Sequence, residues 1–308
     1  MRHFRALGVK RIDAFRSGKA TLVDESQARP DRVYDSLETA LDERPDAVVI
    51  ATPTSLHVPM ALAAVRAGTN VLIEKPLSHT LEGCEELADE AKQRGVIVTV
   101  AQNLRFHPSL RVLQSMIKKG EPLGDPLMAR AHFGTYLPDW HPWEDYRISY
   151  AARSDLGGGA ALTHGHEIDL ILWMFGSVEA VIGMEMGMQP LGTDVDEASV
   201  IVARHASGML SVITLSLAQK PASRTLEIAA TRGTAHLDLL TGRWEIRLAN
   251  GLTQTGTPPT GFELDHTFRD QAASFLSAIR GEGAPAVGLD EAIQALKIAL
   301  AKGNHDAS

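Results

Sequence analysis

The segment Glu74-Lys75-Pro76 places a carboxylate and an amine directly after the apolar run "NVLI". At the carboxyl edge of a parallel sheet, such residues lie where these folds bind their ligands. A lysine there could share a proton with a substrate or stabilise a developing negative charge. The alternative interpretation is a surface ion pair at a strand end, because exposed pairs of this kind are common.

A second chemically suggestive stretch covers residues 154–176 and reads "SDLGGGAALTHGHEIDLILWMFG". Its three glycines permit close backbone approach or unusual dihedrals before a helix that presents Thr163, His166, Glu167 and Asp169. A histidine beside carboxylates could act as a general base, since its unperturbed pKa is close to neutral. The pair His164-x-His166 also fits zinc, but the spacing places no third ligand, so we predict no metal site.

The elements that must position the lysine alternate along the first third of the chain. Four apolar runs are typical of strands covered on both faces: residues 11–15, 46–52, 70–75 and 96–102. Residues 36–45 and 55–68, between them, have helical spacing. This alternation predicts an α/β fold with a Rossmann-like, doubly wound parallel sheet.

After Gln102 the pattern changes to a helix over 108–120 and a series of alternating strands joined by glycine-containing turns. The strands are expected at 126–136, 179–187, 197–206, 208–218, 224–233, 234–242 and 243–251. A helix over 165–175 interrupts this antiparallel meander, and helices over 266–280 and 289–302 follow. We therefore predict a dinucleotide-binding domain over 1–103 and an α+β domain with a large open antiparallel sheet over 104–308.

Composition excludes several classes of protein. The formal net charge of -8 and the scattered basic residues argue against a nucleic-acid partner. No apolar run has the length of a membrane span, and the first residues lack the pattern of a secretory signal. The single cysteine, Cys84, is expected to be a packed thiol. These features predict a cytoplasmic protein.

Three motifs, in order, resemble the Gfo/Idh/MocA family of NAD(P)-dependent oxidoreductases: "EKP" after a strand, "QNLRFHP" at the domain junction and "GGGAALTHGHEID". That family joins a Rossmann domain to a domain with an open, mostly antiparallel sheet. The resemblance implies an oxidoreductase that acts on a sugar, a sugar derivative or a cyclitol. Alternatives are a cofactor-assisted glycoside hydrolase or lyase, and a sugar-binding protein that has lost the dinucleotide.

The resemblance also implies roles for single residues. Lys75 would stand beside the nicotinamide and the substrate hydroxyl. Thr163 occupies the position of a family aspartate, and Glu167 that of a family histidine; a related branch has histidine at the position of His166, which we therefore predict as the acid/base. The cofactor would be lined by Thr52, Pro53, Thr54, His57, Glu74 and Asn103. The substrate would be contacted by Arg105, Trp143, Arg147, Tyr150 and Thr163, although core packing is an alternative for the aromatic residues.

The start of the chain resembles the helix that follows the glycine-rich turn in this family. We expect the first strand and that turn to be absent, through a misplaced start or through loss of cofactor binding. The first is favoured because Lys75 and His166 remain. At the end of the second expected strand, Arg16 and Ser17 stand where an acidic residue would favour NAD. They favour NADP over NAD.

An open sheet face needs cover. We expect the alternating Ile, Leu and Val of "MLSVITLSLA" and "TLEIAATRG" to supply an apolar surface, and a homo-oligomer to form through it.

Overall fold

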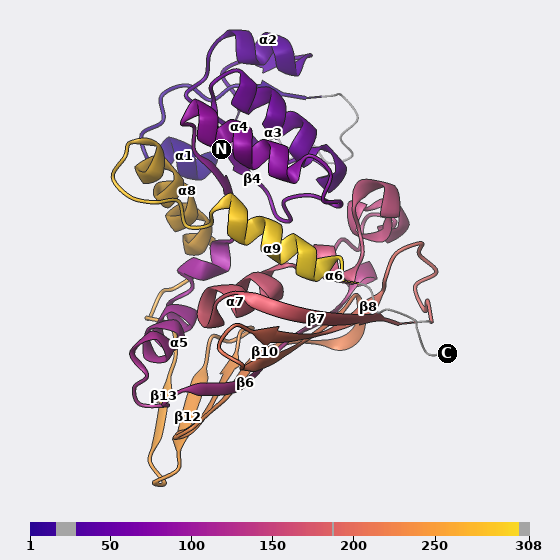
Figure 1. Ribbon diagram of the computed structural model, residues 1–308. Helices are drawn as coiled ribbons and strands as arrows, with labels where there is room; N and C mark the ends of the chain where they lie inside the picture. Colours follow the sequence, from indigo (N-terminus) through magenta and orange to yellow (C-terminus); the bar gives the residue numbers. More distant parts are fainter. Residues whose placement is uncertain (17–28, 187, 302–308) are drawn as a thin grey trace.

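The computed structural model describes residues 1–16, 29–186 and 188–301. Its first layer is a parallel sheet of β3 (Ala47–Ile50), β4 (Asn70–Ile73) and β5 (Val98–Val100). Figure 1 labels β4 in its upper half, among the helices of this layer. A separate parallel pair joins β1 (Ala14–Phe15) to β2 (Val33–Tyr34). The predicted Rossmann-like parallel arrangement is confirmed. Ser17 lies outside the described residues.

Helices flank these strands: α1 (Arg2–Ala6), α2 (Leu37–Asp42), the 3-10 turn η1 (Thr54–Leu56), α3 (His57–Arg66) and α4 (Cys84–Arg94). The sequence of α4 explains its limits. Acidic Glu85 and Glu86 lie in its first turn, and Gly95, with φ 66°, closes it in the left-handed conformation. Cys84 and Leu87 form its buried face and are fully buried. The expectation of a packed thiol is confirmed.

Two helices from the end of the chain return to the parallel sheet (Figure 1). Phe275 of α8 (Asp265–Ile279) packs with Leu72 and Ala101. Ile293 of α9 (Leu289–Ala299) belongs to the same buried cluster as Ile73. We had assigned these helices to the unit over 104–308, but they complete the core of the first sheet. A division near residue 103 stays a prediction.

The second layer is a large mixed sheet with the order β13-β12-β11-β10-β6-β9-β8-β7. Its strands are β6 (Pro126–Tyr136), β7 (Val178–Glu185), β8 (Ala198–His205), β9 (Leu210–Ser216), β10 (Ala218–Ala230), β11 (Gly233–Asp238), β12 (Trp244–Leu248) and β13 (Thr253–Gly256). Every neighbouring pair is antiparallel except β6 and β9, which run parallel. The expected simple meander is therefore wrong at this pair, because β6 inserts between β9 and β10.

One face of this sheet is covered by α5 (Pro108–Lys119), α6 (Ala160–Thr163) and α7 (His166–Phe175). Ile213, Leu215, Leu226 and Ile228 point into this core and are at most 2% exposed. We had expected them to form an exposed apolar face, and that expectation is wrong. Side chains alternate along a strand, so only alternate positions reach the open face. The exposed apolar side chains of β7, β8 and β9 are instead Ile182, Met184, Val200, Val202 and Leu210.

Short 3-10 segments follow β5 and β6. They are η2 (Asn103–Phe106), η3 (Leu137–Asp139), η4 (Tyr146–Ile148), η5 (Tyr150–Ala152) and η6 (Ser154–Leu156). Among the helices of the described residues, none has the length and apolarity needed to cross a membrane.

Candidate active site

Lys75 follows β4, and its partner is a backbone carbonyl rather than a surface carboxylate. The amide of Glu74 donates to the Ile50 carbonyl oxygen across 2.8 Å, which fixes the chain just before the lysine. Lys75 Nζ donates to the Thr163 carbonyl oxygen across 2.7 Å. Burial lowers the pKa of Lys75, and the Glu74 carboxylate opposes that shift. Such an amine exchanges its proton more readily near neutral pH than a solvated lysine does.

Three consecutive glycines lie in tightly packed surroundings, and the first of them, Gly157, meets the first layer. Gly157 and Gly159 have φ values of +80° and +106°, which side chains disfavour. A Cβ on Gly157 would lie 2.8 Å from Thr54 Cβ, and one on Gly158 would lie 2.4 Å from the Tyr150 carbonyl oxygen. The predicted close approach and unusual dihedrals are confirmed. The approach of Gly157 to Thr54 brings the segment before α6 against the first layer.

His166 begins α7, and its ring is held by Gln102 from the end of β5. His166 Nδ1 lies 2.6 Å from Gln102 Oε1. An amide oxygen only accepts, so Nδ1 carries the hydrogen and Nε2 keeps a lone pair. Burial lowers the pKa of His166 well below 6.5, and the positive charge of Lys75 adds to the shift. The neutral ring therefore has the protonation state that a general base needs.

The ring of His164 contacts Ser216 and Phe133 rather than Gln102. Its Nε2 lies 3.2 Å from the Ser216 carbonyl oxygen, and its ring packs on Phe133 with centroids 4.2 Å apart. Burial lowers the pKa of His164 to about 3. Within residues 1–16, 29–186 and 188–301, no group of three or more His, Cys, Asp or Glu side chains could hold a metal ion.

Two carboxylates in the first turn of α7 pair with arginines from different layers. Glu167 Oε1 accepts from Arg224 Nε of β10 across 2.7 Å. Asp169 accepts two bonds from Arg105 of η2, at 2.7 and 2.9 Å. Arg105 Nη1 also donates to Glu291 Oε2 across 3.0 Å. The guanidinium of Arg105 is thus held inside the protein, and its predicted substrate contact stays a prediction.

The predicted cofactor-lining residues meet at the carboxyl ends of β3 and β4. His57 lies between two of their loops, with Nδ1 2.8 Å from the Pro76 carbonyl oxygen and Nε2 2.9 Å from that of Thr52. Burial lowers the pKa of His57, and the two carbonyls oppose the shift. Pro53 begins the turn to η1, in which Thr54 is buried. Thr52 Oγ1 is buried without a protein partner.

The remaining predicted residues differ in how deeply they are buried and in their partners. Asn103 is buried, and its Nδ2 donates to Thr267 Oγ1 of α8 across 2.7 Å. Tyr150 is 38% exposed, and burial of its phenol, followed by the Glu74 carboxylate, raises its pKa. Trp143 is 73% exposed. Arg147 pairs with its neighbour Asp145. In the described part of the chain, no hydrogen bond, ion pair or ring contact joins Trp143 or Arg147 to Lys75 or His166.

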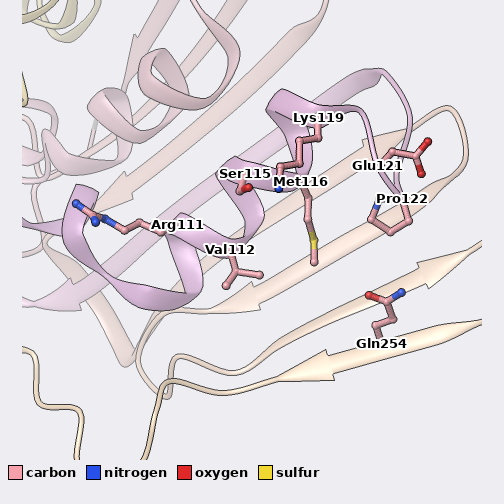
Figure 2. A pocket seen from close by; sticks show the side chains of 8 residues that line it. All are labelled: Arg111, Val112, Ser115, Met116, Lys119, Glu121, Pro122 and Gln254. Atoms are coloured by element: carbon pink, nitrogen blue, oxygen red, sulfur yellow. The ribbon is translucent and has the colours of Figure 1, made fainter.

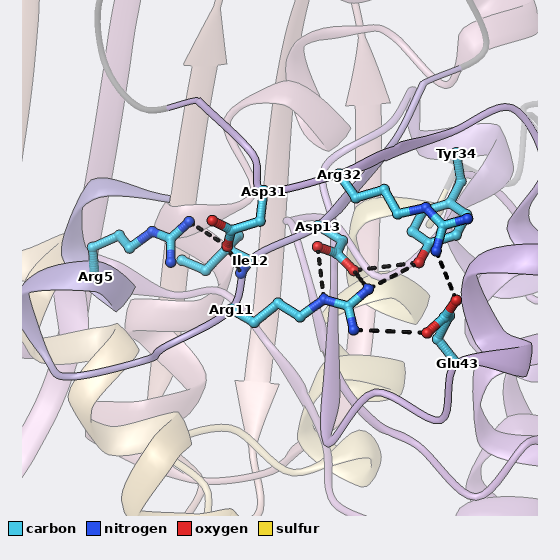
Figure 3. Close-up of polar contacts among 8 residues, drawn as sticks. All are labelled: Arg5, Arg11, Ile12, Asp13, Asp31, Arg32, Tyr34 and Glu43. Carbon is cyan, nitrogen blue, oxygen red and sulfur yellow. Dashed lines mark hydrogen bonds and ion pairs between the residues drawn. The ribbon is translucent and has the colours of Figure 1, made fainter.

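Figure 3 shows the polar network around β1 and β2. Arg11 pairs with Asp13 across 2.8 Å and also reaches Tyr34 and Glu43. Asp13 is therefore engaged by the protein itself. Arg16, at the end of β1, is exposed and has no charged partner among the described residues.

A groove of about 560 Å³ lies elsewhere, between α5 and the edge strand β13 (Figure 2). None of the predicted site residues lines it. Its walls are Arg111, Val112, Ser115, Met116, Lys119, Glu121, Pro122 and Gln254.

Sequence reasoning missed Gln102 and Arg224. Gln102 stands in the quoted motif "QNLRFHP", but nothing in the motif pairs it with His166. Arg224 carried a usable signal, because it is in phase with the buried Leu226 and Ile228 on one strand. Charged residues are rarely buried, so a charged residue in phase with the buried side chains of a strand indicates a functional or structural role, whereas an exposed charged residue does not.

The chain matches two family models. Residues 8–102 match a model described as "Oxidoreductase family, NAD-binding Rossmann fold". Residues 110–236 match the GFO/IDH/MocA C-terminal domain.

Similar proteins and structures point the same way. A 1,5-anhydro-D-fructose reductase from Ensifer adhaerens is 30% identical over 83% of this chain and 76% of its own length. A levoglucosan dehydrogenase from Pseudarthrobacter phenanthrenivorans is 30% identical over 61% of this chain and 54% of its own length. A solved levoglucosan dehydrogenase, in complex with NADH and levoglucosan, superposes with a TM-score of 0.79 at 22% identity, over 88% of this chain and 80% of that one. That likeness shows the fold.

Proposed function

The chain belongs to the Gfo/Idh/MocA family of oxidoreductases, and from that membership we propose that it oxidises or reduces a small carbohydrate-like substrate. A hydride passes between a nicotinamide cofactor and a hydroxyl-bearing carbon of a sugar, a sugar derivative or a cyclitol. One observation of the site carries the proposal. Lys75 from the first layer bonds to Thr163 of the second, and the charge of Lys75 acts on His166 three residues later.

The protein's own residues handle the proton of the reacting hydroxyl. In the oxidation direction, His166 Nε2 accepts that proton, and Gln102 keeps the opposite nitrogen protonated. Lys75 Nζ donates to the hydroxyl oxygen and stabilises the negative charge that develops on it. Glu74 lies beside the amine and, with Glu167, opposes the loss of its proton. Reduction reverses these transfers.

The residues at the carboxyl ends of β3 and β4 fit a dinucleotide cofactor. Thr52 Oγ1 is buried and lacks a protein partner, so it is free to bond to a bound molecule. Thr52, Pro53, Thr54, His57, Glu74 and Asn103 would hold the group there. When bound, nicotinamide supplies the acceptor or donor of the hydride. Arg16 is exposed and suits a 2′-phosphate, whereas Asp13 is paired with Arg11. We therefore favour NADP over NAD.

The first experiment measures absorbance at 340 nm with NAD and with NADP on a panel of cyclitols, anhydrosugars and aldoses. Lys75→Met should lower kcat/KM by at least about 10³-fold, because the hydroxyl oxygen loses its charged donor. Lys297→Met is the matched control: this exposed lysine pairs with Glu85 at the surface, and its loss should leave kcat/KM unchanged. Chromatography must show a substrate that is oxidised and not cleaved. Full activity in Lys75→Met would contradict the proposed role of the lysine.

We also propose a cytoplasmic homo-oligomer. Its contact would be the open face of the mixed sheet, where Ile182 and Met184 of β7 and Val200 and Val202 of β8 are 41–66% exposed. The buried state of Cys84, the single cysteine, suits a reducing compartment. Light scattering tests the assembly, and a monomer at micromolar concentration would refute it.

A further inference from the structure

Arg224 is a charged residue on the inner face of the mixed sheet. It follows the same side of β10 as Leu226 and Ile228, which are 1% exposed. Its cross-strand neighbour on β6 is Phe133, and the guanidinium carbon lies 4.2 Å from the centre of that ring. The side chain of Arg224 is 13% exposed and that of its partner Glu167 is 1% exposed. Burying these charges is costly unless hydrogen bonds satisfy both groups.

The pair leaves hydrogen-bonding capacity unused. Arg224 Nη2 is buried without a protein partner, and so is Glu167 Oε2. The Thr163 hydroxyl, four residues before Glu167, is a third such group. Buried polar atoms nearly always have a partner, so a water or a ligand must meet these three.

The unused groups belong to the cluster around the catalytic amine. The backbone carbonyl of Thr163 accepts from Lys75 Nζ. Burial is the main cause that lowers the pKa of Lys75, and the charges of Arg224 and Glu167 act on the same group. A molecule that touches the amine is therefore within reach of the pair.

The second arginine–carboxylate pair of α7 provides a contrast. Arg105 and Asp169 share two hydrogen bonds, Nη1 of Arg105 donates to Ala286 and Glu291, and neither side chain is left with a buried unpartnered atom. Of these two arginine–carboxylate pairs, the one formed by Arg224 and Glu167 keeps buried atoms without a partner, whereas the one formed by Arg105 and Asp169 keeps none among the described residues.

We propose that Arg224 and Glu167 form a hydroxyl-recognition pair that selects uncharged polyols. The inference rests on the proposed function and narrows its substrate class. Arg224 Nη2 donates to one substrate hydroxyl, Glu167 Oε2 accepts from another, and the Thr163 hydroxyl can do either. Because the charges of the pair cancel, an anionic sugar gains no net attraction from Arg224 and is repelled by the free oxygen of Glu167. Sugar acids and sugar phosphates are therefore poor ligands.

The test uses two matched pairs of probes that differ in charge: D-glucose with D-glucuronate, and myo-inositol with myo-inositol 1-phosphate. Calorimetry measures binding to the full chain, and turnover is followed with NAD and with NADP. Wild type should bind at least one neutral member about 10-fold or more tighter than its anionic partner. In Glu167→Gln, Arg224 loses its counter-charge, and the ratio should move toward the anion by about 10- to 100-fold. Asp169→Asn, the matched control, should leave the ratio unchanged.

Arg224→Lys is the second variant, and it serves if Glu167→Gln does not fold. It keeps the positive charge and removes Nη2, so affinity for the neutral probe should fall about 10-fold. The recognition pair is overturned if the ratio is the same in wild type, Glu167→Gln and Asp169→Asn, if Arg224→Lys binds as wild type does, or if no probe binds. If the probes bind with the expected ratios but are not oxidised with either cofactor, the proposed function fails and the recognition pair stands.

Discussion

The first turn of α7 presents two carboxylates that meet two arginines in different ways. Asp169 receives a two-pronged contact from Arg105, and both side chains are 4% exposed. Glu167 receives a single bond from Arg224, with a free oxygen and a free nitrogen left over. The two carboxylates are two positions apart on one helix. Residues two positions apart on an α-helix point to different sides of it, so the two carboxylates meet different elements.

This difference suggests different roles for the two pairs. Arg105 and Asp169 join elements of the fold, whereas Arg224 and Glu167 are available to bind a ligand. Arg105 connects η2 to α7 and, through Ala286 and Glu291, to the region of α9. It ties the C-terminal helices to the residues that follow β5. Arg224 connects the mixed sheet to α7 beside Lys75 and leaves donors and acceptors open. A fully satisfied pair adds rigidity, whereas an incompletely satisfied one offers groups to a ligand.

The largest effect is expected from a substitution that breaks the pair of Arg105 and Asp169. Asp169→Asn leaves Arg105 buried with a weakened partner and should lower the free energy of unfolding by about 3–5 kcal/mol. Glu167→Gln should lower it by only about 1–3 kcal/mol, because one hydrogen bond joins that pair and the amide oxygen can still accept it. Urea denaturation followed by circular dichroism measures both. Equal losses would contradict the division into a joining and a recognising pair.

A smaller effect is expected from a substitution in the glycine segment that precedes Thr163 and Glu167. Gly158→Ala forces a Cβ to within 2.4 Å of the Tyr150 carbonyl oxygen, which is backbone and cannot easily move. The overpacking should cost about 1–3 kcal/mol of stability, and the displaced segment carries Thr163. Gly283→Ala is the control, since a Cβ there has no neighbour within 4 Å. Thermal denaturation of both variants decides the point, and equal melting temperatures would show that the close approach is unimportant.

The smallest effect is a shift in pH dependence. The base must be neutral, so kcat/KM rises through the pKa of His166, which burial moves below 6.5. The amine must be charged, so kcat/KM falls through the pKa of Lys75, which burial moves below 10.5. Glu167 raises the pKa of Lys75, so Glu167→Gln should move the basic limb to lower pH. Asp169→Asn should leave that limb in place. If the basic limb of the kcat/KM profile stays at the same pH in both variants, the charge of Glu167 does not affect the pKa of Lys75.

Much of the fold was predictable because local patterns and tertiary packing agree. Continuous apolar runs became β3, β4 and β5, and the glycines at 157–159 made the close approach that small residues allow. The parallel pairing of β6 with β9 was not predictable. A strand's alternation tells which side chains share a face but does not say which strand will lie beside it.

By itself, the sequence determined the parallel sheet, the lysine at its carboxyl edge and a helix over about 165–175, since these follow from short-range patterns. Only the tertiary structure decided that Gln102 holds His166, that Arg105 joins α7 to η2, and that Arg224 reaches Glu167 from 57 residues away. Such partners are brought together by the packing of one layer on the other. No local spacing encodes a contact between side chains on different elements, because its geometry exists only once those elements have docked.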